Sequence, residues 1–294
     1  MIGAIEAGGT KFVCGIGNDQ GEILDQTLFP TGTPEETLAQ AVRFFRGKPM
    51  EAIGVGSFGP IDLDPGSSTY GYITTTPKEN WRQFDFVGAL RKQFQVPIGF
   101  DTDVNAAALG ESVLGAAKGL GSCLYMTVGT GIGAGTVAEG KLIHGMQHPE
   151  MGHILVKRHP EDHFQGICPY HGDCLEGLAS RPALEKRWGK RGYQLELTHK
   201  AWEIEAYYIA QTVVTFILIL SPKKIIVGGG IMKQRHLFPL IREQVQFLLN
   251  GYVQQEEVIK AVENYIVPPA LGDCSGLYGA LMLGRQAKCG SEAG

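Results

Sequence analysis

The chain has 294 residues, of which 44% are hydrophobic and 19% are charged, and it carries a formal net charge of −4 at pH 7. Such a composition is typical of a folded globular protein, and the length is sufficient for two domains of ordinary size. Because a general nucleic-acid-binding protein is expected to be basic, the acidic balance argues against that class.

The start of the sequence has no basic segment followed by a long apolar run, so it shows no secretory signal. The longest apolar run, Val213 to Leu220, is much shorter than the ~20 residues that a membrane span requires. We therefore expect a cytoplasmic protein that does not cross a membrane. In that reducing compartment the six cysteines should not form a disulfide framework.

The first predicted unit is a β-hairpin over Ile2 to Gly17, in which two apolar strands flank the turn Gly8-Gly9-Thr10. The same pattern returns at Cys123 to Val137 around Gly129-Thr130-Gly131, which predicts a duplicated domain. Two such hairpins facing one cleft would present backbone N–H groups to phosphate, because glycine leaves the donors uncovered. Glycine turns also join strands in many proteins without a ligand, so neither turn identifies a site by itself.

Between the hairpins, helices alternate with short apolar strands, a pattern that predicts a mostly parallel sheet. Thr33 is placed to cap the first helix, and a proline takes the first helical position. The predicted elements are a helix over Pro34 to Phe45, a strand over Ala52 to Ser57, a helix over Phe84 to Gln95 and a strand over Pro97 to Phe100.

The stretch from Val96 to Glu111 passes from an apolar strand through a polar turn into a helix of small residues. Carboxylates at such a junction lie at the carboxyl edge of a sheet, where α/β proteins bind their ligands. We therefore predict that Asp103 is a general base. The alternative is that Asp101 and Asp103 only cap the helix, because Asp at a helix start accepts bonds from free backbone N–H groups.

The sequence G-T-G-I-G-A, which begins at Gly129, loosely fits a dinucleotide-binding motif. That motif requires a helix directly after the glycines, whereas a strand and a turn at Glu139-Gly140 are predicted here, so we exclude a nicotinamide site. Further on, we predict a long apolar helix over Ala201 to Leu220 and a strand over Lys224 to Val227. Gly228-Gly229-Gly230 then turns the chain into another helix, and either nucleotide binding or tight packing would explain that turn.

Three residues with zinc-binding side chains follow a C-x2-H-x2-C spacing, namely Cys168, His171 and Cys174. Thiolate and imidazole groups are zinc ligands, so this spacing predicts a structural zinc site. A closed structural site needs a fourth ligand. The spacing leaves five upstream histidines open for that position: His144, His148, His153, His159 and His163.

Four motifs occur together in the chain: E-A-G-G-T-K, D-T-D-V-N-A-A-A-L-G-E, T-V-G-T-G-I-G-A-G, and P-E-M-G-H followed by C-x2-H-x2-C and Glu176. In this order, and over nearly the whole chain, they resemble the ROK family of sugar kinases and sugar-responsive repressors, and most closely its bacterial fructokinase branch. The resemblance implies an α/β fold of two ribonuclease-H-like lobes around a central cleft. We place the N-terminal lobe at 1–118, completed by a C-terminal helix at 275–290. The C-terminal lobe would span 119–274 and carry a zinc loop at 153–174.

The resemblance further implies ATP-dependent phosphorylation of a hexose, with D-fructose as the expected substrate, Mg2+ and a structural Zn2+ as metals, and a homodimer as the assembly. Asp103 would be the catalytic base, and His153 would be the fourth zinc ligand beside Cys168, His171 and Cys174. The implied sugar contacts are Gly59, Pro60, Thr75, Thr102, Glu150, His153 and Glu176. The implied nucleotide contacts are Thr10, Lys11, Thr130, Gly131, Trp188, Gly228, Gly229 and Gly230.

Phosphoryl transfer of this kind needs a carboxylate that takes the proton of the attacking hydroxyl group. The position of Asp103 at a helix start leads us to expect that the helix dipole keeps it ionised at neutral pH. Two departures from the family pattern affect the expected Mg2+ position and one sugar contact: Glu6 stands where many relatives have Asp, and Thr102 stands where they have Asn. Alternative functions are a glucokinase or mannokinase of broader hexose specificity, a non-catalytic sugar-sensing regulator, and an actin-like ATPase.

Overall fold

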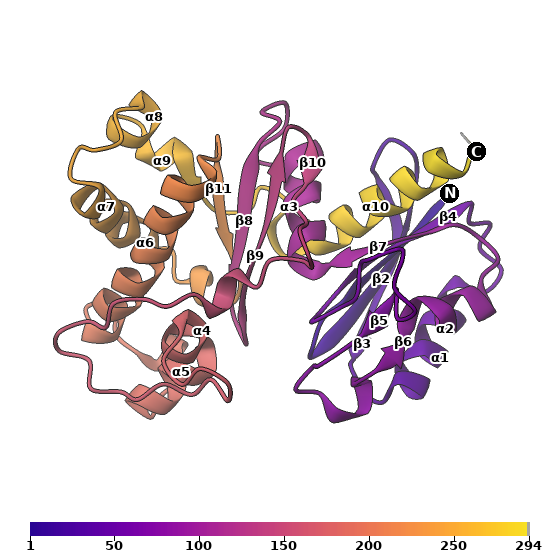
Figure 1. Cartoon of the computed structure of the whole chain (residues 1–294), viewed down its shortest axis with the longest axis horizontal. Coiled ribbons are helices and arrows are strands. Elements are labelled where there is room, and N and C mark those ends of the chain that lie inside the picture. Colours follow the sequence, from indigo (N-terminus) through magenta and orange to yellow (C-terminus); the bar gives the residue numbers. More distant parts are fainter. Residues whose placement is uncertain (293–294) are drawn as a thin grey trace.

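Two five-stranded sheets with the same strand order form the centres of two lobes (Figure 1). The structure is a computed structural model, and it describes residues 1–292. The N-terminal sheet has the order β3-β2-β1-β4-β7, and the C-terminal sheet has the order β10-β9-β8-β11-β12. In each sheet the first three strands in this order are antiparallel neighbours, and the other two are added in parallel. This repeat confirms the predicted α/β fold of two ribonuclease-H-like lobes.

The N-terminal sheet is built around β1 (Ile2–Ala7), which is buried along its whole length except for the partly covered Glu6. Its hairpin partner is β2 (Lys11–Gly17), as the sequence predicted. The other strands of this sheet are β3 (Ile23–Pro30), β4 (Ala52–Ser57) and β7 (Ile98–Thr102), and a separate two-stranded ribbon is formed by β5 (Tyr72–Ile73) and β6 (Phe84–Asp85).

Helix boundaries in this lobe follow the capping residues. Helix α1 (Pro34–Phe45) has the predicted limits, because Thr33 and Glu36 form a reciprocal capping box at its start. Helix α2 (Phe86–Gln93) begins two residues later than predicted, because the side chain of Asp85 accepts a bond from the backbone N–H of Gly88 at 2.8 Å and acts as its N-cap. A short 3-10 helix, η1 (Glu79–Trp81), places the buried Trp81 in the core of this lobe.

The C-terminal sheet repeats the hairpin with β8 (Cys123–Val128) and β9 (Ile132–Ala138). Strand β9 continues directly after the glycines of the turn, and Glu139-Gly140 then turns the chain with positive φ angles of 51° and 76°. Gly129–Gly131 is thus followed by a strand, as predicted, and not by the helix that a dinucleotide-binding motif requires. The remaining strands of this sheet are β10 (Lys141–Leu142), β11 (Ile225–Gly228) and β12 (Ile266–Val267).

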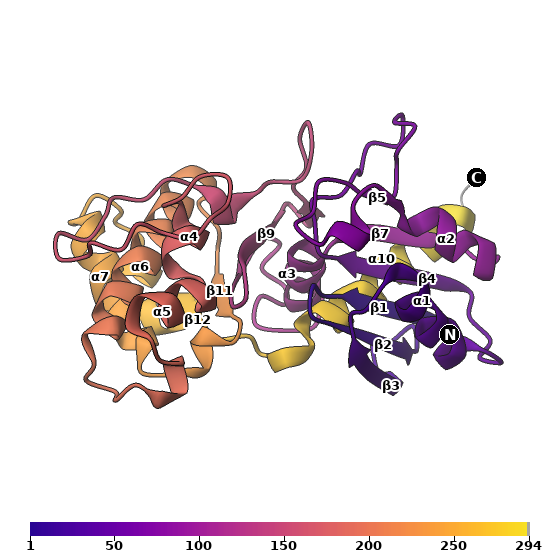
Figure 2. The same ribbon diagram turned by 90° about the horizontal axis from the view of Figure 1, so that it is seen from below.

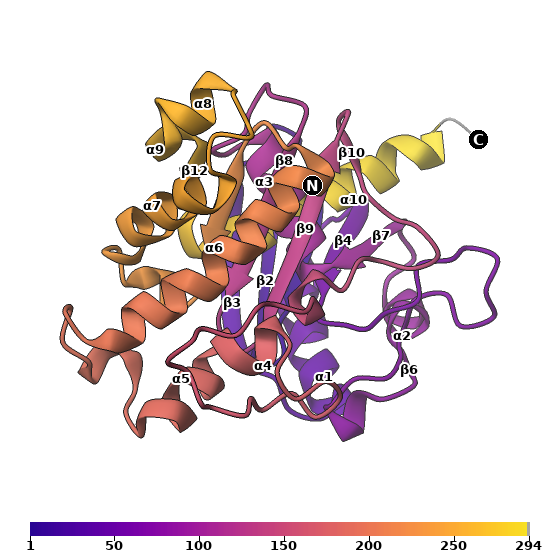
Figure 3. The ribbon, with the colours of Figure 1, turned by 60° about the vertical axis from the view of Figure 1, so that its left-hand side comes forward.

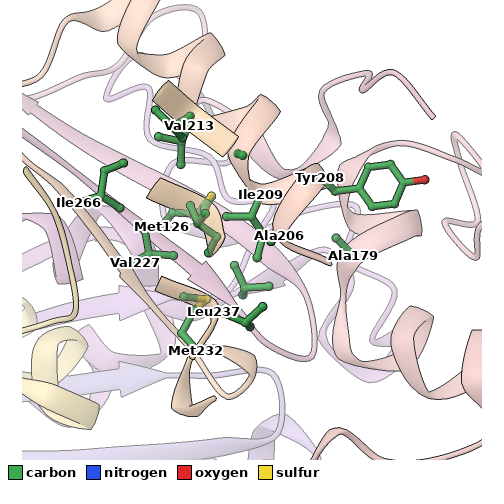
Figure 4. Close-up of a cluster of buried hydrophobic side chains, with 14 of the residues drawn as sticks. Met126, Ala179, Ala206, Tyr208, Ile209, Val213, Val227, Met232, Leu237 and Ile266 are labelled. Atoms are coloured by element: carbon green, nitrogen blue, oxygen red, sulfur yellow. The ribbon is translucent and has the colours of Figure 1, made fainter. Parts of the chain in front are cut away.

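Helix α6 (Lys200–Leu220) is the main core helix of the C-terminal lobe. It packs side by side with α7 (Leu237–Leu249), and residues of both helices share one core cluster with the sheet (Figure 3). Although α6 is long and apolar enough to cross a membrane, its buried side chains pack against β8 and β11 (Figure 4). It is therefore a core helix of a globular lobe. The other helical segments of this lobe are η2 (Met151–His153), α4 (Leu175–Ala179), α5 (Arg181–Trp188), η3 (Gly192–Gln194), η4 (Ile231–Lys233), α8 (Glu256–Ile259), α9 (Val262–Tyr265) and η5 (Gly272–Cys274).

The two lobes exchange helices at their junction. Helix α3 (Asp103–Val113) follows the last strand of the N-terminal sheet but packs on β8 and β9, whereas α10 (Ser275–Glu292) follows the C-terminal sheet but packs on β1, β4 and β7 (Figures 1 and 2). Glycines allow this close approach. A Cβ atom at Gly54 would lie 1.7 Å from the carbonyl oxygen of Ala280, and one at Gly279 would lie 1.6 Å from that of Ala106.

Candidate active site

A cavity of about 660 Å³ lies between the lobes, at the N-terminal end of α3. Its wall includes charged side chains from both halves of the chain, among them Glu6 and Lys11 on one side and Lys233 and Arg235 on the other. Asp103 faces the same space. The residues that line the cavity are Glu6, Lys11, Asp103, Val104, Ala107, Tyr125, Thr127, Arg181, Val227, Gly228, Gly229, Gly230, Met232, Lys233, Arg235, Pro269, Gly272, Asp273, Ser275 and Gly276.

Asp103 is the first residue of α3, and Thr102 is the N-cap. The hydroxyl oxygen of Thr102 accepts a bond from the backbone N–H of Asn105 at 3.1 Å, so neither Asp101 nor Asp103 supplies the helix cap. Thr102 is only 5% exposed, and its predicted contact with a sugar stays a prediction. The side chain of Asp103 remains free to face the cavity, apart from a bond of 2.8 Å that its Oδ1 accepts from the N–H of Val104.

The environment of Asp103 in the free protein acts against the ionisation that the helix dipole alone would favour. Burial raises the pKa of this carboxyl to about 7, and the nearby Glu6 carboxyl raises it further. Burial likewise raises the pKa of Glu6 to about 7, although Lys11 opposes the change. Loss of solvation and like-charge repulsion thus outweigh the helix dipole at this position. Two adjacent carboxyl groups that share one water-poor space are suited to a divalent cation or to proton transfer.

The side chain of Glu6 lies against Gly276, which has no side chain of its own. A Cβ atom at Gly276, in the first turn of α10, would lie 2.6 Å from the carboxyl carbon of Glu6. The carboxyl group of Glu6 therefore lies directly against a position at which α10 carries no side chain.

Glycine turns and cations line one end of the cavity. Gly229 has a φ of +93°, and a Cβ atom there would lie 2.4 Å from the carbonyl oxygen of Val128. Arg181, which the sequence reasoning missed, donates from its guanidinium group to the hydroxyl of Thr130 at 2.8 Å and reaches the cavity wall. Its position after the P-E-M-G-H and zinc segments gave no motif signal. Guanidinium groups are well suited to phosphate oxygens.

The structure brings only part of the predicted nucleotide set to this cavity. Lys11, Gly228, Gly229 and Gly230 line it. Thr10, Thr130 and Gly131 lie in the two hairpin turns, whereas Trp188 packs against the core of the C-terminal lobe, with its ring 4.9 Å from that of His199. The geometry therefore gives the predicted nucleotide contact of Trp188 no support.

Two further carboxylates lie on the segment that follows the second hairpin. Oε2 of Glu176 accepts a bond from the backbone N–H of Ile132 at 2.9 Å, and Oε1 lies 4.0 Å from Nε2 of His153. The pKa of Glu150 is raised to about 7, mainly because the carboxyl group is buried. The negative charges of Asp103 and Glu176 raise it further. These charge interactions indicate that Glu150 lies near both Asp103 and Glu176.

The cis Gly59-Pro60 peptide and the loop after β5 belong to the N-terminal lobe, and Gly59 lies against the ring of His148. The carbonyl oxygen of Pro60 accepts bonds from the backbone N–H and the hydroxyl of Thr74, at 2.8 and 3.1 Å, and the adjacent Thr75 is exposed. The two segments could therefore form the floor of a binding site for a small polar molecule.

His153, Cys168, His171 and Cys174 come together with their ligand atoms within 4.8 Å of one another. Nδ1 of His153 lies 3.5 Å from Sγ of Cys174 and 3.8 Å from Sγ of Cys168, and Nδ1 of His171 lies 3.6 Å from Sγ of Cys168. These separations match the edges of a tetrahedron with metal–ligand distances of roughly 2.0–2.3 Å, so the four residues fit Zn2+. Of the five candidate histidines, the structure places His153 in this cluster.

The family model of the ROK family matches residues 2–287. A fructokinase from Pediococcus pentosaceus is 48% identical over 98% of this chain and 98% of its own length. A ROK hexokinase from Thermus thermophilus has a similar fold, with a TM-score of 0.77 and 26% identity over 100% of this chain and 99% of that chain. A ROK family glucokinase from Streptomyces griseus, solved in complex with glucose and AMPPNP, gives a TM-score of 0.78 at 24% identity, over 97% of this chain and 99% of that chain.

Proposed function

The chain belongs to the ROK family, and on this basis we propose that it transfers the γ-phosphoryl group of ATP to the 6-hydroxyl group of D-fructose. The observation that carries this proposal is that Asp103 lines a cavity of glycine turns and cations and also lies close enough to Glu150 for their charges to interact. A phosphoryl donor and a polyhydroxylated acceptor could meet at this carboxyl group. The 48% identity to a fructokinase over nearly the whole chain supports fructose as the acceptor.

In the proposed reaction, Asp103 accepts the proton of the attacking hydroxyl group as its oxygen bonds to the γ-phosphorus and the bond to the ADP oxygen breaks. Lys11, Arg181, Lys233 and Arg235 would bind the phosphate oxygens. Glu6, beside Asp103, would hold Mg2+, which when bound neutralises phosphate charge. Glu150, His153 and Glu176 would bind sugar hydroxyl groups above the floor formed by Gly59, Pro60 and Thr75.

The cluster of two cysteines and two histidines would hold a structural Zn2+. The distances place Nδ1 of His153 towards the thiols and Nε2 towards Glu176, so one ring could join the metal cluster to the sugar site. Such a link fixes the orientation of the ring and its tautomer. The metal would thereby shape the sugar site without taking part in phosphoryl transfer.

We further propose lobes at 1–118 and 119–274, with the first completed by the helix at 275–290. Packing of α10 on β1, β4 and β7 supports this division. A cytoplasmic location and a homodimer complete the proposal.

A coupled assay of ADP release across D-fructose, D-glucose and D-mannose tests the function. We expect the highest kcat/KM for D-fructose. Comparable values for glucose and mannose would favour the alternative of a kinase with broader hexose specificity, and ADP release without any sugar would contradict the kinase assignment.

A further inference from the structure

The carboxylate of Glu111 ties together the two connections between the lobe sheets. One connection runs from β7 through α3 to β8, and the other runs from β12 to α10 through the segment 268–274. Glu111 lies in the last turn of α3 and is fully buried, at 0% exposure. Its Oε2 accepts a bond from the backbone N–H of Ala116 at 2.7 Å, within the first connection. Its other bonds come from the second connection.

Three hydrogen bonds hold the segment 268–274 and the start of α10 on this carboxylate. The backbone N–H of Ala270 donates to Oε2 at 3.2 Å, and that of Leu271 donates to Oε1 at 3.0 Å. The hydroxyl of Ser275 donates to Oε1 at 2.7 Å. With the bond from Ala116, each carboxylate oxygen accepts two bonds, which uses the full capacity of about four acceptor sites that a carboxylate offers.

The segment that Glu111 holds is one wall of the cavity between the lobes. Oδ2 of Asp273 lies 2.8 Å from Nζ of Lys233, one of the cations proposed to bind phosphate, and Gly276 is the residue against which Glu6 lies. The residues of this wall are Pro269, Gly272, Asp273, Ser275 and Gly276. Its place therefore affects both a phosphate-binding cation and the proposed Mg2+ ligand.

We propose that Glu111 is a positioning residue that sets this wall against α3 and so determines how tightly the nucleotide is bound. This inference rests on the proposed function, in which the cavity binds ATP. Because α3 is a continuous helix that begins at Asp103, a wall held at its last turn keeps a fixed place relative to the general base. Among residues 1–292, those that line the cavity do not include Glu111, so it acts through the segment that it holds.

Two substitutions weaken this anchor by different amounts. E111Q keeps the length of the side chain and exchanges one acceptor oxygen for an NH2 group. Whichever oxygen is exchanged, the NH2 group faces the backbone N–H of Ala270 or of Leu271, so two donors oppose each other and the wall loses at least one bond. S275A removes one bond to the carboxylate and leaves both backbone bonds in place.

We expect E111Q to raise the KM for ATP about tenfold, as the loss of a hydrogen bond to a charged group implies, while the KM for D-fructose changes less than about twofold. S275A should raise the KM for ATP by a smaller factor. In an E111Q background, S275A should change this KM by less than about twofold, because its partner charge is already gone. T33A, which removes the N-cap of α1, controls for lost stability: it should lower the Tm and leave both KM values unchanged.

A KM for ATP within about twofold of the wild-type value in active E111Q overturns the positioning role, as does an equal rise in both KM values. An effect of S275A that is the same with and without E111Q also contradicts the role, because Ser275 would then act on the nucleotide by itself. If E111Q does not fold, S275A decides: an unchanged KM for ATP contradicts the role, and a rise confined to ATP supports it. A wild-type protein that phosphorylates no hexose overturns the proposed function and this inference together, whereas unchanged variants of an active wild type concern Glu111 alone.

Discussion

Oδ2 of Asp101 lies 2.7 Å from Nε2 of His144, and this contact joins the last strand of the N-terminal sheet to the segment that follows β10. Asp101 is 3% exposed and also accepts bonds from the N–H of Thr102 and from Nδ2 of Asn105. The carboxylate therefore orders the start of α3, where Asp103 stands, and at the same time holds the chain that leads to Glu150. The bond to Asp101 raises the pKa of His144.

The Asp101–His144 contact should make stability depend on pH in a defined direction. Since the pKa of His144 is raised in the folded state, its contribution is fully present below the unfolded value of 6.5 and is lost as the pH rises through the folded value. H144A should therefore lower the Tm more at pH 6 than at pH 9. The exposed M146A variant is a matched control, and an equal loss of Tm at both pH values would show that the pair carries no charge.

Replacement of Asp103 by Asn should reduce kcat by ~10² to 10⁴ while the KM values for sugar and ATP change little, because general-base assistance is lost and binding is kept. Steady-state kinetics with D-fructose measure both parameters. The wild-type kcat/KM should fall as the pH is lowered through about 7, where the Asp103 carboxyl of the free protein takes up its proton. Turnover of D103N within a few-fold of the wild type would show that another group accepts the proton.

The raised pKa values of the Glu6 and Asp103 carboxyl groups should lower the free energy of unfolding of the free protein as the pH rises from about 4 to about 7. Glu6 and Asp103 have ordinary values of 4.5 and 3.8 but titrate near 7 in the folded state, so over this range the folded protein holds protons that the unfolded chain has released. The free energy of unfolding therefore decreases with rising pH. E6Q should flatten the Tm–pH curve measured by thermal melting, and a curve as steep as that of the wild type would contradict the assignment of this slope to Glu6.

Removal of one thiol from the cysteine–histidine cluster should release the metal and destabilise the fold together. We expect C168S to lose most of its zinc by elemental analysis and to melt at a lower temperature, because metal binding contributes to folding free energy. C289S, which changes an exposed thiol on α10, is the matched control. A metal-free C168S variant with the wild-type Tm and activity would rule out a structural zinc.

Arg181 should act on ATP and not on sugar. R181A is expected to raise the KM for ATP about tenfold, because a guanidinium group loses its charge-assisted bonds to phosphate. K186A, an exposed cation in the last turn of the same helix, should leave both KM values unchanged. An equal rise in the KM for fructose would place Arg181 in the sugar site instead.

Short-range signals explain which features the sequence predicted. The limits of α1, the two hairpins and the Glu139-Gly140 turn follow from capping residues and glycines within a few positions. The late start of α2 and the capping role of Thr102 depend on which of several neighbouring polar side chains accepts a hydrogen bond from the free backbone N–H groups of the helix. Sequence patterns do not determine which side chain does so.

The missed features all depend on contacts between distant parts of the chain. Arg181 meets Thr130 across 51 positions, and His148 meets Ile61 across 87. The raised pKa of Asp103 has the same origin, because Glu6 and the buried cleft reach it only after both lobes have formed. The residue types of a site can therefore be predicted from motifs, whereas its electrostatics and its supporting contacts cannot.

The exchange of α3 and α10 has a consequence for synthesis on the ribosome. Ile2 and Ala4 on β1 share a buried cluster with Leu277 and Leu281 on α10, so this face of β1 is covered only after α10 has been made. An emerging N-terminal half exposes this apolar face until the C-terminal half has been made. Part of the core of this chain thus depends on contacts between segments that are far apart in sequence, and such contacts form late and slow folding.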